Sequence, residues 1–116
     1  MTLVDTSIWI SHLRANNPRL VAALGKGLVL MHPFVIGELA CGNLMNRVEL
    51  LHLLGSLPAA QVATEAEALA FIEMKALAGT GIGYLDVHLL ASASLSNASL
   101  WTSDKKLGQV AETLGL

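Results

Sequence analysis

The sequence predicts an α/β fold in which a central parallel sheet is flanked by helices. Short apolar runs typical of buried strands alternate along the chain with amphipathic segments of helical periodicity. Helical connections between successive strands favour parallel pairing. With 116 residues, 53% of them hydrophobic and only 14% charged, the chain is expected to form one domain over residues 1–116, and intrinsic disorder is excluded.

The first predicted elements are a strand and two helices. Thr2–Val4 is a short apolar strand. Asp5 and the two hydroxyl residues after it offer N-cap oxygens to an amphipathic helix that continues to Leu13. Asn17 and Pro18 then cap and begin a second helix, because proline fits the first helical turn, and glycines end it.

The next segment predicts a second strand and two more helices. Leu28–Met31 is a continuous apolar run, as expected of a strand buried on both faces of a parallel sheet. Pro33 begins a third helix that stops near Gly42. Asn46 and Glu49 have the spacing of a capping box and predict a fourth helix after them.

The remaining part of the chain predicts two long helices and a strand. Gln61–Ala63 gives a weak strand signal, and Thr64 with Glu67 forms a full capping box for the helix that follows. After a glycine-rich loop, Tyr84–Leu95 is an apolar helix. Leu100–Thr102 is predicted as a strand that ends next to a serine and an aspartate.

Four of the nine acidic residues lack a simple surface explanation. Glu38 and Asp86 each continue the apolar stripe of a predicted helix, where a lone buried charge is costly. Asp5 and Asp104 each follow a predicted strand, and ligands bind at the carboxyl ends of parallel strands. The alternative for each is a cap on a helix start. The other five acids cap helices or are expected on exposed faces: Glu49, Glu65, Glu67, Glu73 and Glu112.

A cluster of these four carboxylates would need a counter-charge. At a separation of about 5 Å and an effective dielectric of about 20, each pair repels by roughly 3 kcal/mol. An all-oxygen ligand set without an adjacent cysteine or histidine favours Mg²⁺ or Mn²⁺. Such a metal can activate water and neutralise a phosphodiester, which is the chemistry of metal-dependent nucleases. With 7 basic and 9 acidic residues, the chain would need a metal to act on a polyanion.

At these residues the sequence resembles the PIN-domain family, and specifically the VapC-type ribonuclease toxins of toxin-antitoxin modules. The order and spacing of the matching segments carry the resemblance over nearly the whole chain. Those segments are Leu3–Ser7, Gly37–Leu39, Asp86 with Ala91 and Ala93, and Thr102–Asp104.

The resemblance implies a three-layer PIN-like fold and a metal-dependent endoribonuclease. It implies that the four acids are catalytic and coordinate Mg²⁺ or Mn²⁺ around a water that cleaves RNA: Asp5, Glu38, Asp86 and Asp104. A hydroxyl such as that of Thr6 or Thr102 would position the fourth acid or the water. The implied partners are an RNA substrate, a cognate VapB-like antitoxin lying across the acidic groove, and a second copy of the chain in a homodimer.

Basic residues near the predicted cluster could contact RNA phosphates. The candidates are Arg14, Lys105 and Lys106, with Arg47 as a further one, and the alternative for each, solvated surface charge, is the more common role. The two lysines follow Asp104 where relatives often carry another acid, so one or two metals remain possible. His32 stands where small polar residues are frequent in the family, and no histidine has ligand spacing or an assigned role.

Rival functions are less consistent with the sequence. A haloacid dehalogenase-type phosphatase needs a second aspartate two residues after the first, and Ser7 stands there. The remaining alternative is a non-catalytic PIN-like interaction module, which should have lost some of the acids. The longest stretch without a charged side chain, Val87–Ser103, contains several serines and cannot span a membrane. The lone Cys41 is expected to be buried and agrees with a cytoplasmic protein, as does the absence of a signal-peptide pattern.

Overall fold

Three short parallel strands form the sheet in the computed structural model, which describes residues 1–116. They are β1 (Thr2–Val4), β2 (Val29–Leu30) and β3 (Ser99–Trp101). The order β2-β1-β3 places β1 in the centre, with Leu3 opposite Leu30 on one side and Leu100 on the other. The predicted α/β fold with a parallel sheet is confirmed.

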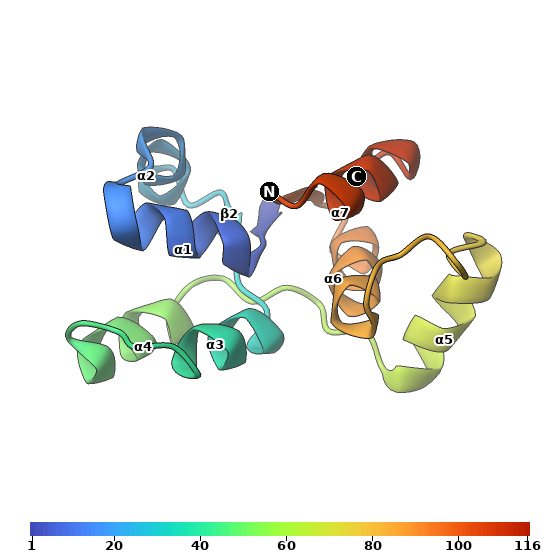
Figure 1. Cartoon of the computed structure of the whole chain (residues 1–116). Helices are drawn as coiled ribbons and strands as arrows, with labels where there is room; N and C mark the ends of the chain where they lie inside the picture. The colour runs from blue at the N-terminus through green and yellow to red at the C-terminus, as the bar shows by residue number, and fades with distance from the viewer.

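Seven helices surround this sheet. In Figure 1, α1 to α4 lie on the left and α5 to α7 on the right, with the strands between them, as in a three-layer α/β fold. The helices are α1 (Thr6–Ala15), α2 (Pro18–Gly25), α3 (Pro33–Ala40), α4 (Arg47–Gly55), α5 (Glu65–Met74), α6 (Tyr84–Leu95) and α7 (Lys105–Thr113). None of them combines the length and apolar character needed to cross a membrane.

Of the predicted caps of α2, α4 and α5, two are confirmed and one is wrong. The Asn17 side chain accepts the Leu20 amide at 3.1 Å at the start of α2. Thr64 and Glu67 form the predicted capping box of α5. Asn46 precedes α4 in a left-handed conformation with φ of 51°, which asparagine tolerates, and its side chain forms no cap hydrogen bond.

The weak strand signal at residues 61–63 is also wrong. The sheet-like contact falls earlier, where the Ala60 amide donates to the Met31 carbonyl at 2.9 Å. The Gln61 amide instead donates to the hydroxyl of Ser96, the C-cap of α6, at 2.8 Å, and the Ala63 amide donates to that of Ser92 in α6 at 3.2 Å. Because side chains of a helix satisfy these amides, the segment forms no fourth strand.

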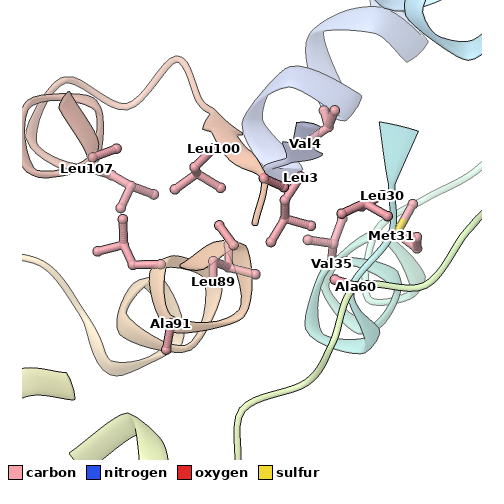
Figure 2. Close-up of a cluster of buried hydrophobic side chains, with 14 of the residues drawn as sticks. Leu3, Val4, Leu30, Met31, Val35, Ala60, Leu89, Ala91, Leu100 and Leu107 are labelled. Atoms are coloured by element: carbon pink, nitrogen blue, oxygen red, sulfur yellow. The ribbon is translucent and has the colours of Figure 1, made fainter. Parts of the chain in front are cut away.

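A cluster of 25 buried hydrophobic residues fills the space between the sheet and the helices. Figure 2 shows Leu3 near its centre, with Leu89 and Leu100 on one side and Leu30 and Val35 on the other. Leu3 is completely buried, and a buried leucine contributes about 1.5–3 kcal/mol. The packing therefore holds the ends of β1 and β3 in a fixed relation. The prediction that Cys41 is buried is wrong: it ends α3 and is exposed.

Candidate functional site

Asp5 lies directly after β1 and is buried, with 8% of its surface exposed. It occupies the N-cap position of α1, yet its side chain makes no cap hydrogen bond. Its Oδ2 instead accepts the hydroxyls of Ser7 at 2.8 Å and Thr102 at 2.7 Å. Two hydroxyls therefore orient this carboxylate, and Oδ1 has no protein donor.

The hydroxyls of Ser7 and Thr102 connect the ends of two neighbouring strands. Thr102 accepts the Asp104 amide at 3.0 Å, and Ser7 accepts the Ser103 amide at 3.1 Å. The two hydroxyl oxygens are 3.3 Å apart. Sequence reasoning treated Ser7 only as a possible helix cap and missed this contact. The available signal was the spacing Asp-x-Ser, which lets a serine hydroxyl reach the carboxylate two residues earlier.

Asp104 caps a helix, which is the alternative role that the sequence left open for it. It is the N-cap of α7, and its Oδ1 accepts the Leu107 amide at 2.9 Å. Its Oδ2 has no protein donor, so the cap leaves one oxygen for another ligand. The carboxylate is exposed and stands next to the loop that Thr102 anchors.

Glu38 is located on α3, and its Oε1 accepts the Thr6 hydroxyl at 2.7 Å. The expectation that Glu38 continues a buried stripe is wrong, because its side chain is exposed. Val35 and Leu39 carry the buried face of this short helix, and Glu38 lies beside that face toward the start of α1. Thr6 itself is buried, so it holds Glu38 from the protein side.

Asp86 is half-buried in the first turn of α6, and the Gly83 amide donates to its Oδ2 at 3.3 Å. Burial raises the pKa of its carboxyl above the usual 3.8, while the Gly83 hydrogen bond opposes that change. The charges of Asp5, Asp104 and Glu38 raise this pKa further. The other three acids are therefore close enough for their charges to act on Asp86, and no salt bridge compensates this negative charge.

The four carboxylates do not form a closed cage. No three carboxylate, imidazole or thiol side chains approach closely enough in this arrangement to hold one ion. The donor set nevertheless fits a hard divalent cation, because each acid keeps one carboxylate oxygen without a protein donor. The unfavourable charge at Asp86 is what such a cation would relieve.

Basic side chains lie beside these acids without forming salt bridges to them. Lys105 and Lys106 are exposed in the first turn of α7, directly after Asp104. Arg14 lines a cavity of about 470 Å³ together with Glu38. Arg47 has a structural contact instead, because its guanidinium donates to the carbonyls of Ala40 and Gly42 at the end of α3.

The cavity beside Glu38 is mainly apolar. Helices α1 and α3 form two of its walls, and Leu50 of α4 and residues 42–45 complete it. Met45, at its rim, is 86% exposed. An open apolar cavity next to an acidic cluster is suited to a ligand with both apolar and cationic groups.

Comparison with known proteins supports the sequence resemblance. The PIN domain family model matches residues 2–113, a range that includes all four acids. Two curated relatives from two strains of Mycobacterium tuberculosis carry the name Ribonuclease VapC32. Each is 46% identical over 108 residues, which covers 92% of this chain and 87% of the relative.

Proposed function

This chain belongs to the PIN-domain family as a VapC-type member, and from that premise we propose that it is a metal-dependent endoribonuclease toxin. The observation that carries the proposal is the position of Asp5. It follows the central strand, two hydroxyls orient it, and one of its oxygens has no protein donor. The charges of Asp5, Glu38 and Asp104 all raise the pKa of the fourth acid, Asp86.

We propose that the four acids hold Mg²⁺ or Mn²⁺: Asp5, Glu38, Asp86 and Asp104. The bound cation would supply an activated water and neutralise charge on the scissile phosphodiester. Ser7 and Thr102 orient the carboxylate of Asp5, and Thr6 orients that of Glu38. Oδ1 of Asp104 remains bonded to the Leu107 amide, and its Oδ2 would bind the cation.

The RNA backbone would enter along the basic residues that border these acids. Arg14, Lys105 and Lys106 are exposed and can neutralise phosphates on either side of the cleaved bond. Their contribution would be orientation of the strand, because phosphate contacts carry no sequence information. In this proposal the toxin acts in the cytoplasm.

We also propose a VapB-like antitoxin as the partner and a homodimer as the assembly. The names of the curated relatives support the antitoxin, since VapC-type toxins are paired with VapB antitoxins. The apolar cavity beside Glu38 could receive its inhibitory segment. Co-expression with the neighbouring open reading frame, followed by light scattering of the purified complex, tests both statements. Failure of any small protein to copurify would contradict the first, and a monomer mass would contradict the second.

RNA cleavage by the antitoxin-free chain tests the catalytic proposal. We expect cleavage with Mg²⁺ or Mn²⁺, none in EDTA, and a loss of orders of magnitude in Asp86→Asn and Glu38→Gln. Glu49→Gln is the matched control, because Glu49 is an exposed acid in the first turn of α4. Cleavage that persists in EDTA would contradict a metal mechanism. A chain that neither cleaves RNA nor binds Mn²⁺ would favour the non-catalytic interaction module.

A further inference from the structure

Two histidines without an assigned role are buried at the start of α3 and in α6, the helices that carry Glu38 and Asp86. His32 is the N-cap of α3 and is completely buried, and His88 is located on α6 with 4% of its surface exposed. Nδ1 of His32 accepts the Phe34 amide at 2.9 Å. That nitrogen therefore carries no proton, so neutral His32 carries its proton on Nε2. Burial, and secondly the charge of His88, lowers the pKa of His32 to about 4, which keeps it neutral at pH 7.

One nitrogen of each ring is buried without a partner. These atoms are Nε2 of His32 and Nδ1 of His88. The first is a donor in the tautomer that the helix cap requires, and the second can accept. Buried polar atoms are rarely left unpaired, because the loss of hydration is then uncompensated. The two unpaired atoms thus have complementary hydrogen-bonding needs.

A shared aromatic neighbour holds the two rings in the same part of the core. The Phe34 ring centroid is 4.9 Å from that of His32 and 5.0 Å from that of His88. Tyr84 also packs edge-on against His88, with the two ring centroids 4.6 Å apart. These four rings connect the start of α3 with the first turns of α6.

We propose that one buried water bridges His32 and His88 and so fixes α3 relative to α6, with His32 Nε2–H donating to the water and the water donating to His88 Nδ1. This inference rests on the proposed function, and in it both histidines are positioning residues for the metal site. Glu38 is located on α3, which has only eight residues, so a tilt at its capped end also moves Glu38. Asp86 precedes His88 by two residues in α6. The pair thereby sets the distance between two of the four acids.

Proton positions on the two imidazoles test the pair directly. Long-range ¹H–¹⁵N correlation spectra of the whole chain in EDTA at neutral pH report which nitrogen carries each proton. We expect both histidines as Nε2–H tautomers, with the His32 proton protected from exchange with solvent. A proton on Nδ1 of His88, or rapid exchange at His32 Nε2, would overturn the pairing.

A double-mutant cycle tests the positioning role. His32→Asn keeps an acceptor for the Phe34 amide but cannot reach His88, and His88→Leu keeps bulk without a polar atom. Each single variant should raise the Mn²⁺ dissociation constant about 10-fold or more. The double variant should raise it no further, because either change already breaks the pair. Effects that multiply in the double variant would overturn the proposal.

His12→Asn is the control for the cycle. Nδ1 of His12 also accepts a backbone amide, that of Asn17 at 2.9 Å, at a turn distant in sequence from the acids of α3 and α6. Its Mn²⁺ affinity should equal that of the wild type. A wild-type chain that binds no Mn²⁺ would contradict the proposed function, whereas the proton positions and the same cycle in urea unfolding would still decide the pair.

Discussion

Thr102 donates its hydroxyl hydrogen to Oδ2 of Asp5 at 2.7 Å, across 97 positions of the sequence. The contact arises because β1 and β3 are parallel neighbours, so the residues that follow them meet at one edge of the sheet. The same hydroxyl accepts the Asp104 amide at 3.0 Å. One threonine thus orients one acid and anchors the loop that carries another.

Replacing this hydroxyl should weaken the metal site more than the fold. Thr102→Val keeps the shape but removes the donor to Asp5, and loss of such a contact typically lowers metal affinity or activity about 10- to 100-fold. The free energy of unfolding should fall by about 1–2 kcal/mol. Calorimetric Mn²⁺ binding, cleavage rates and urea unfolding measure the three quantities. Thr113→Val, which removes an exposed hydrogen bond to the Gln109 carbonyl, is the control. Equal effects of the two variants on Mn²⁺ affinity would argue against a positioning role for Thr102.

The two roles of Asp104 can be separated by two substitutions. Asp104→Asn preserves the acceptor for the Leu107 amide and should change stability little, because asparagine caps a helix about as well as aspartate. Asp104→Ala removes the cap and should cost about 1 kcal/mol. Both variants should lose metal-dependent cleavage. If Asp104→Asn cleaves RNA like the wild type, Asp104 is a helix cap alone.

Stability should decrease as the pH falls below about 6.5, with His32 as one identifiable cause. Burial lowers the pKa of His32 from 6.5 to about 4, so between these values the unfolded chain binds a proton that the native chain does not. The stability that neutral His32 contributes is fully present above pH 6.5 and is lost as pH falls through 4. The total loss amounts to about 3 kcal/mol.

Comparison with His32→Asn isolates this contribution. The raised pKa of Asp86 has the opposite effect on stability, because there the native chain binds the proton more readily than the unfolded chain. Ionised Asp86 destabilises the native chain, and this cost disappears as the pH falls. Urea unfolding from pH 7 to 4 should therefore show a smaller decrease in the variant than in the wild type. Parallel pH profiles would show that His32 is not held neutral by the fold.

Local patterns in the sequence predicted much of the fold. The Asn17 and Thr64 caps depend on residues within three positions, and both were found. The placement of Asp5 and Asp104 followed from one rule about strand ends in parallel sheets. Their clustering with Glu38 and Asp86 was inferred because these four acids lack a surface explanation, and it agrees with the charges that act on Asp86.

The features that sequence reasoning missed depend on contacts between distant segments. Glu38 is exposed because Thr6, 32 positions away, holds it beside the buried face of α3. The two serines that accept the amides of Gln61 and Ala63 lie 35 and 29 positions further on, at and near the end of α6, and these bonds replace the expected strand. Neither contact leaves a mark in local periodicity, because each depends on how two elements pack.

The central claim is that Asp5 is a metal ligand, and Asp5→Asn tests it most directly. Asparagine keeps an acceptor for the hydroxyls of Ser7 and Thr102 and removes one negative charge. In EDTA, the free energy of unfolding should stay the same or rise, because repulsion with the other acids decreases. Measured on the same preparation, Mn²⁺-dependent RNA cleavage should fall by orders of magnitude. An Asp5→Asn chain that melts far earlier yet cleaves RNA normally per folded molecule would show that Asp5 has a structural role and binds no metal.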